Sequence, residues 1–183
     1  EMCIRDRSCG FCKVKFMARF SLKLSANCLK AAFASTILLI SAQAQAEPGP
    51  FRGLSGHWAG AGTITMTNGA TERIRCKVAY AVNATGKAVE QSLRCASDTY
   101  RVEISSNVMS EGGSLSGSWA ETTRGLSGNV SGHATGAEIL ANVAGAGFTA
   151  RLDVRTHGDK QSVTITPQGD TDVAAVSIAL RKG

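Results

Sequence analysis

The sequence from Glu47 onward predicts an all-β protein, an antiparallel up-and-down barrel of about eight to ten short strands. Apolar and polar residues alternate with a period of two over several stretches, which is typical of strands with one dry and one solvated face. Glycine-containing turn signals separate these stretches. No window in this part of the chain shows the 3.6-residue period of an amphipathic helix. A closed barrel is favoured because it leaves no exposed strand edges and needs only local connections.

Two segments precede this domain, and the first has no structural pattern. Residues 1–16 contain Cys3, Cys9 and Cys12 and show no periodicity. The Cys9-x-x-Cys12 spacing occurs in zinc and redox motifs, but no second ligand pair follows it. We therefore expect residues 1–16 to be a non-native or disordered leader.

Residues 17–46 have the three parts of a secretory signal peptide. Three basic residues are followed by a short apolar run at 31–40 and then by the cleavage signal Ala44-Gln45-Ala46. We expect the mature protein to begin at Glu47 and to be located in the periplasm or secreted. The apolar run is too short to cross a bilayer as a stable helix, so we expect no membrane span in the mature protein.

The positive charge of the chain belongs mainly to these two segments. The chain has 20 Lys and Arg residues against 14 Asp and Glu, but seven basic and two acidic residues precede Glu47. The remaining 13 basic and 12 acidic residues are nearly balanced, so we expect no nucleic-acid partner. Residues 47–183 are enough for a substantial core, and we expect them to form a single β-barrel domain.

The first strand of the barrel is expected within residues 54–66, which are rich in glycine. Gly60 and Gly62 follow Trp58 at alternate positions. Glycine is tolerated inside a strand where the strand bends sharply or another backbone comes close, as in the first strand of a barrel. Asn68-Gly69 then predicts a hairpin turn into the next strand.

Three consecutive antiparallel strands are expected over residues 72–104. If residues 84–87 form the first turn, Cys76 falls directly opposite Cys95, and both lie on the apolar face. A two-residue slip would keep the apolar faces matched but would separate the two cysteines. No other cysteine follows the predicted cleavage site. We therefore expect a cross-strand disulfide that fixes the register, in an oxidising compartment.

The later strands are separated by further turn signals and have apolar inward faces. Their expected inward residues are Ile139, Ala141 and Val143; Phe148, Ala150, Leu152 and Val154; Val163 and Ile165; and Val176, Ile178 and Leu180. The expected outward positions are polar and include Arg73, Arg75, Lys77, Arg94, Arg101, Arg151 and Asp153. An outer-membrane barrel would need an apolar outward face, so these charges favour a soluble barrel.

Gly56-x-Trp58 on the first strand resembles the opening motif of the calycin superfamily, the lipocalin-like barrels. The resemblance implies that the tryptophan closes one end of the barrel and that an arginine or lysine of the last strand packs across it. Arg181 is placed for that role. Residues 54–58 also resemble the start of small periplasmic metalloprotease-inhibitor barrels, which are exported and disulfide-bonded. The rest of the chain carries no further lipocalin motif.

A small apolar ligand is the first candidate partner. Its candidate contacts are Trp58, Tyr80, Gln91, Tyr100 and Trp119. The two tryptophans either line a pocket or fill the core. Gln91, like Glu121, falls on a predicted inward face, where it either contacts a ligand or lies at a wet rim.

We expect no catalytic, metal or cofactor site, and therefore no enzyme. The histidines His57, His133 and His157 lack ligand-like spacing, and no Gly-x-Ser-x-Gly motif is present. No helix follows the glycines of residues 56–62, so they do not form a dinucleotide-binding motif.

Two classes of function remain. The first is a binding module, a periplasmic barrel that holds a small apolar molecule in its mouth. The alternative is a protein-interaction barrel, such as a periplasmic protease inhibitor or envelope partner, that binds through its rim or its N-terminal segment. A connected cavity bordered by Tyr80, Gln91 and Tyr100 would favour the first class. A filled barrel with a protruding segment at residues 47–52 would favour the second.

Overall fold

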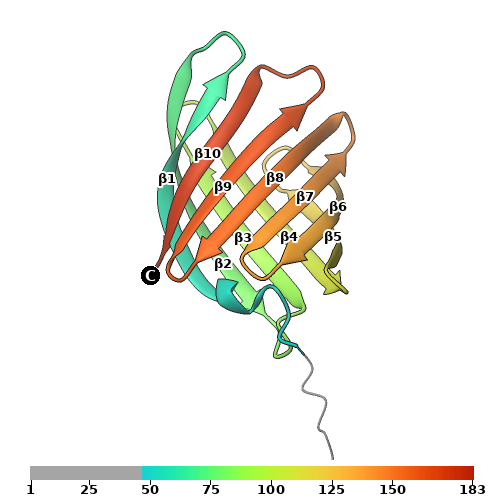
Figure 1. Cartoon of the computed structure of the whole chain (residues 1–183). Helices are drawn as coiled ribbons and strands as arrows, with labels where there is room; N and C mark the ends of the chain where they lie inside the picture. The colour runs from blue at the N-terminus through green and yellow to red at the C-terminus, as the bar shows by residue number, and fades with distance from the viewer. Residues whose placement is uncertain (1–46) are drawn as a thin grey trace, which may run out of the picture. The chain divides into compact units, whose positions relative to one another are not determined.

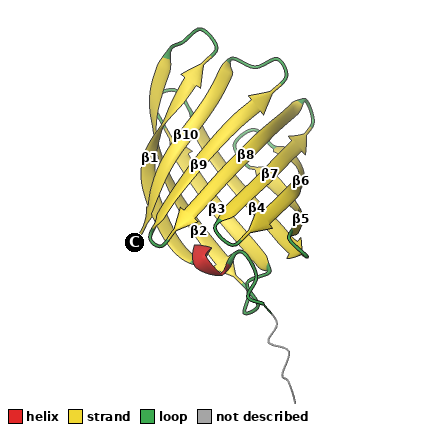
Figure 2. Ribbon diagram, in the orientation of Figure 1, coloured by secondary structure: helices red, strands yellow, loops and turns green. Residues whose placement is uncertain are grey.

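Ten strands follow a short 3-10 helix in the computed structural model, which describes residues 47–183 (Figures 1 and 2). The expected leader and signal peptide lie outside the described residues. The elements are η1 (Arg52–Leu54), β1 (Gly56–Met66), β2 (Thr71–Val82), β3 (Ala88–Ala96), β4 (Arg101–Glu111), β5 (Ser114–Glu121), β6 (Leu126–Thr135), β7 (Glu138–Gly145), β8 (Phe148–His157), β9 (Lys160–Gln168) and β10 (Val173–Lys182).

Each strand pairs antiparallel with its neighbours in the sequence, and β1 pairs with β10 to close the barrel. The pairing of the first and last strands runs from Trp58 opposite Lys182 to Met66 opposite Val173, with one register shift after Thr65. Closure gives every strand two hydrogen-bonded neighbours. The structure therefore confirms the predicted all-β, up-and-down barrel.

The glycines of β1 lie where this strand meets β10. A Cβ atom at Gly60 would overlap the backbone of Ala179, and one at Gly62 would overlap the backbone of Ser177. Side chains at these two positions would push β10 away, so glycine permits the closing pair of strands to approach each other.

The interior contains two groups of buried side chains, each built around one tryptophan. Trp58 packs with residues of β1, β2, β3 and β10, while Trp119 packs with residues of η1, β3, β5, β6 and β7. Both indoles are nearly inaccessible, with exposed fractions of 2% and 8%. The second group includes the small residues Ala134 and Ala141, and Ala150 is buried on the neighbouring strand β8. This side of the barrel is therefore less completely filled by side chains.

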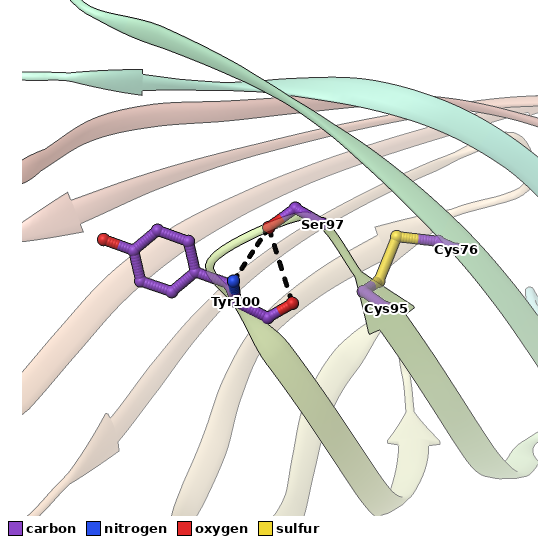
Figure 3. The surroundings of a disulfide bond; sticks show 4 residues. All are labelled: Cys76, Cys95, Ser97 and Tyr100. Atoms are coloured by element: carbon purple, nitrogen blue, oxygen red, sulfur yellow. Dashed lines mark hydrogen bonds between the residues drawn. A yellow bond between two sulfur atoms is a disulfide. The ribbon is translucent and has the colours of Figure 1, made fainter.

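Cys76 and Cys95 form a disulfide between β2 and β3, as the sequence predicts (Figure 3). They are direct partners in the ladder, with their Cα atoms 4.1 Å apart. The same register places Tyr80 opposite Gln91. Beyond the disulfide, Ser97 holds the turn into β4, because its hydroxyl accepts a hydrogen bond from the Tyr100 amide at 2.9 Å.

Removing the disulfide should destabilise the barrel without abolishing the fold. Cys76 and Cys95 are separated by 19 positions, and opening a loop of that size should lower the free energy of unfolding by about 3 kcal/mol. We expect a Cys76→Ser/Cys95→Ser variant to melt at a lower temperature in calorimetry and to retain the β-sheet circular dichroism spectrum. Reductant should lower the melting temperature of the parent protein but not that of the variant. An equal melting temperature for parent and variant would show that the crosslink does not stabilise the fold.

Candidate functional site

The barrel encloses a cavity of about 210 Å³ between its two groups of buried side chains. Most lining side chains are aliphatic and come from the inward positions of β2 to β10. The hydrogen-bonding side chains among them include those of Tyr80, Gln91 and Ser106. Ala141 and Ala150 contribute to the wall on β7 and β8, where a larger side chain would occupy the space. The cavity is therefore mainly apolar, with a small number of placed polar groups.

The segment before β1 closes one end of this cavity. Phe51 and Leu54 line it and are themselves buried, with exposed fractions of 1% and 4%. The amides of Gly49 and Phe51 donate hydrogen bonds to the carbonyls of Thr85 and Gly86, at 2.9 and 3.0 Å. These bonds attach the segment to the β2–β3 turn, so η1 lies against the lower end of the barrel in Figure 1. Phe51 and Leu54 together form the floor of the cavity.

Gln91 and Ser106 form a polar pair on the cavity wall. They are direct partners on β3 and β4, and the Ser106 hydroxyl donates a hydrogen bond to Gln91 Oε1 at 3.1 Å. Within residues 47–183, no group accepts a hydrogen bond from the Gln91 amide nitrogen, and this atom is not sealed from open space. The amide can therefore donate a hydrogen bond to a guest in the cavity.

The ring of Tyr80 lines the cavity, and its hydroxyl is hydrogen-bonded to Gln161. The hydroxyl donates to Gln161 Oε1 at 3.0 Å, and Gln161 Nε2 donates to Thr156 Oγ1 at 3.1 Å. Burial raises the pKa of Tyr80 to about 12, against a smaller lowering by the Gln161 hydrogen bond. Tyr80 is thus neutral at physiological pH, and its main contribution to the cavity is apolar surface.

Trp119 is both a core residue and a wall of the cavity. Its ring meets Phe148 edge to face, with ring centroids 6.1 Å apart, and both residues line the cavity. The indole nitrogen donates to the Ala144 carbonyl at 3.4 Å. Gly145 lies against the ring, since a Cβ atom there would be 2.9 Å from Trp119 Cζ2. The indole is therefore held in place from several sides.

The other two predicted ligand contacts, Trp58 and Tyr100, do not line the cavity. The Trp58 indole nitrogen donates to the Leu54 carbonyl at 2.7 Å, and the ring packs in the other group of buried side chains. Tyr100 directly precedes β4, at the opposite end of the barrel, and its ring points away from the disulfide (Figure 3). The structure thus brings Tyr80, Gln91 and Trp119 together, and leaves the other two apart.

The assignment of Arg181 to the face of Trp58 is wrong. Arg181 pairs with Ala59, faces outward and lies 3.9 Å from the carboxylate of Asp159. The cation over the Trp58 ring is Lys182, whose Nζ lies 5.6 Å from the ring centroid. Lys182 is the direct ladder partner of Trp58, so alternation directs the lysine and not the arginine toward the indole. A basic residue of the last strand does pack on the tryptophan, one position later than expected.

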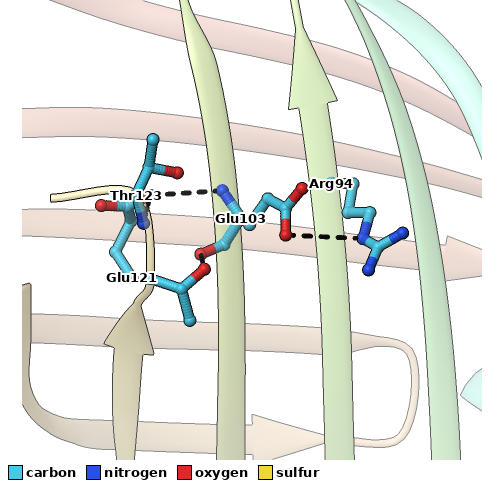
Figure 4. Close-up of polar contacts among 5 residues, drawn as sticks. Arg94, Glu103, Glu121 and Thr123 are labelled. Carbon is cyan, nitrogen blue, oxygen red and sulfur yellow. Dashed lines mark hydrogen bonds and ion pairs between the residues drawn. The ribbon is translucent and has the colours of Figure 1, made fainter. Parts of the chain in front are cut away.

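Glu121 lies on the inward face but outside the cavity, where backbone groups surround its carboxylate (Figure 4). The amides of Thr123 and Arg124 donate to it at 2.9 and 2.7 Å, and the Glu103 amide donates at 3.3 Å. Burial opposes ionisation of Glu121, but these hydrogen bonds outweigh it and lower the pKa of Glu121 to about 2. The charged carboxylate therefore holds the β5–β6 turn and is not free for acid–base chemistry.

The described residues hold no cluster of three His, Cys, Asp or Glu side chains arranged to bind a metal ion. No helix within residues 47–183 is long and apolar enough to cross a membrane.

Three residues of the site were not among the sequence-based candidates. Ser106 has the same parity as Ile104, and Gln161 the same parity as Val163, so alternation alone could have placed both inside. Phe51 had no such signal, because it precedes the first strand and becomes buried only where the chain folds back against the β2–β3 turn.

No protein-family model matches this sequence, and no curated protein matches it. Solved structures do resemble the fold. The crystal structure of Rv2717c from M. tuberculosis has a TM-score of 0.59 and 14% identity, over 75% of this chain and 99% of that chain. The S-type phycobiliprotein lyase CPES from Guillardia theta has a TM-score of 0.48 and 12% identity, over 72% and 89% of the two chains. The chain is a ten-stranded closed antiparallel barrel, and its fold is similar to that of Rv2717c. The similarity to Rv2717c concerns the fold alone.

Substitutions at the Trp58 end should separate the roles of Lys182 and Arg181. Trp58→Ala should lower the free energy of unfolding by about 3–5 kcal/mol, because it leaves a large void in the core. Lys182→Ala should cost about 0.5–1 kcal/mol through the lost cation–π contact. Arg181→Ala, the matched control, should change stability by less than about 0.5 kcal/mol. Urea denaturation measures all three, and a larger effect for Arg181 than for Lys182 would contradict the geometry.

Replacing Glu121 should make the stability of the fold less dependent on pH in the acidic range. Its pKa in the fold, about 2, lies below the usual value of about 4.3 in an unfolded chain. The charged carboxylate therefore stabilises the fold above about pH 4.3, and this contribution disappears as the pH falls toward 2. We expect Glu121→Gln to be less stable than the parent at neutral pH, with the difference shrinking over that window. A constant difference in melting temperature from neutral pH to pH 2 would refute this role.

Proposed function

We propose that the protein binds a small, mainly apolar molecule inside its barrel, with one polar contact at Gln91 and Ser106. The observation that carries the proposal is the cavity inside the barrel, whose wall includes Tyr80, Gln91 and Trp119. Binding sites for small molecules are typically concave and apolar, with few placed polar groups that set the orientation of the ligand. The wall of this cavity has that composition.

The size and lining of the cavity limit the class of ligand. Its 210 Å³ is below the roughly 300–1,000 Å³ typical of sites for drug-sized molecules, so the guest is compact. The aliphatic wall disfavours charged groups, because burying an unpaired charge is costly. The free amide of Gln91 favours a hydrogen-bond acceptor such as a carbonyl oxygen. A small ring or short chain that carries one carbonyl group fits these constraints.

Entry at the end opposite the floor agrees best with the packing. Phe51 and Leu54 block one end, and the hydrogen bonds of Gly49 and Phe51 hold them there. At the other end, Met66 and Val173 are only partly buried, close to the β1–β2 and β9–β10 turns. A guest that entered there would reach the Gln91–Ser106 pair without displacing η1.

We also propose that the domain of residues 47–183 works in the periplasm or outside the cell, because disulfides persist in oxidising compartments.

The alternative, a protein-interaction barrel that binds through its N-terminal segment, has less support. Phe51 is buried against the β2–β3 turn, so this segment closes the cavity and does not protrude as a whole.

Small ligands of matched shape test the proposal. Acetophenone and α-methylstyrene have nearly the same shape, but only the first has a carbonyl oxygen. By calorimetry or NMR titration, we expect both to bind the parent protein. Gln91→Leu should lower the affinity for acetophenone about three- to tenfold, which corresponds to one lost hydrogen bond, and should leave the affinity for α-methylstyrene unchanged. Native mass spectrometry of protein from its producing cells should show a retained small molecule.

A variant that fills the cavity provides the matched control. Ala150→Leu should abolish binding of both compounds by occupying the space, whereas Ala179→Leu, on the exposed face of β10, should not affect binding. Extra methylene groups in a core cost about 1–3 kcal/mol, so melting curves must show that Ala150→Leu is folded. No binding to the parent protein, or undiminished binding to folded Ala150→Leu, would refute the proposal.

A further inference from the structure

The outer face of β2, β3 and β4 carries a concentration of positive charge, which we call the basic wall. It consists of Arg73, Arg75 and Lys77 on β2, Arg94 on β3 and Arg101 on β4. All five residues are exposed. Five of the 13 basic residues after the predicted cleavage site thus lie on three adjacent strands, although the charge of that part of the chain is nearly balanced.

The strand register arranges these side chains in two dimensions. Arg75 and Arg101 lie in one row across the sheet, on either side of Ala96, while Lys77 and Arg94 are direct partners in another row. Neighbouring strands are about 4.8 Å apart, and alternate residues of one strand are about 6.7 Å apart. The basic wall therefore covers an area of about 10 by 13 Å, and does not form a single line of charge.

Most of this charge is not neutralised within residues 47–183. Among the five side chains, only Arg94 has an ion pair in this part of the chain, with Glu103 at 3.7 Å. The nearby carboxylate of Glu72 instead accepts hydrogen bonds from the amide and hydroxyl of Thr99. By contrast, Arg155 on β8 is paired with both Asp153 and Glu138. The basic wall thus retains about four unpaired cations.

The neighbours of the basic wall leave it accessible. The outward residues of β1 beside it are Ala59, Ala61 and Thr63, which are partners of Lys77, Arg75 and Arg73. These small side chains do not cover the longer cations. No Phe, Tyr or Trp faces outward among β1 to β4. Such rings would be needed for base stacking, so a single-stranded nucleic acid is a poor match.

We propose that the basic wall docks the barrel onto an anionic phospholipid surface. A two-dimensional array of unpaired cations matches a plane of phosphate groups, and clusters of about four or more Lys and Arg residues are sufficient to hold a protein at such a surface. The exposed Met109 lies near the end of β4 far from Arg101, so no large apolar side chain stands among the cations and the attachment is electrostatic and reversible. The docking face lies outside the barrel and does not depend on the ligand proposed for its interior.

Vesicle sedimentation tests this proposal directly. At low salt, we expect the protein to bind vesicles that contain phosphatidylglycerol and not vesicles of phosphatidylcholine alone. Binding should weaken steeply as salt rises above about 0.1 M, where charges are screened within about 10 Å. Arg75→Gln/Arg101→Gln should weaken binding about 25-fold, since each cation contributes about fivefold. Arg75→Lys/Arg101→Lys should retain most of the binding, because the charge is kept.

The matched control removes the same charge from the other side of the barrel. Arg151→Gln/Lys160→Gln, on β8 and β9, should leave the partition coefficient within about twofold of the parent. An equal loss in this control would show dependence on net charge alone and would overturn the proposal. It would also be overturned by equal binding to both vesicle types, or by displacement with millimolar inorganic phosphate at constant ionic strength, which would indicate a site for a free anion.

Discussion

The register between β2 and β3, held by the Cys76–Cys95 bond, determines which side of each strand is the interior. A shift of one residue would turn every side chain of a strand to the opposite face. With the observed pairing, Tyr80 and Gln91 face the cavity, while Lys77 and Arg94 face outward as direct partners. The chemistry of both faces therefore depends on one alignment. A two-residue slip would preserve the hydrophobic pattern, so the pattern alone does not specify the register, whereas the disulfide does.

Alternation was sufficient to predict most of the barrel, because it is a local property of the sequence. It placed Tyr80 and Gln91 on inward faces, and together with the turn expected at residues 84–87 it led to the correct pairing of the two cysteines. It was insufficient where the relevant neighbour is distant in the sequence or lies beyond a strand end. The contact between Lys182 and Trp58 depends on the alignment of β1 with β10, which no nearby residue specifies. The burial of Phe51 depends in the same way on a turn more than thirty positions later.

The two tryptophans have different surroundings inside the barrel. Trp58 fills its end, with its indole nitrogen bonded to Leu54 and Lys182 over its ring. Trp119 instead stands beside inward alanines, which leave space that its ring does not occupy. An empty apolar volume costs packing energy, because the groups around it lose their contacts. The well-packed end around Trp58 and the crosslink offset that cost.

The closing pair of strands also places the start of the first strand beside the end of the last. β1 begins beside the end of β10, and the Gly183 amide donates to the His57 carbonyl at 3.0 Å. Each turn of the chain joins two strands that are neighbours in the ring, so the topology does not require the chain to begin at β1. A circularly permuted chain, in which a linker joins Gly183 to Glu47 and the chain opens at the exposed turn near Gly125, would keep every ladder pair. The ten strands therefore form a closed ring of hairpins, and the strand pairing does not determine where in that ring the chain begins.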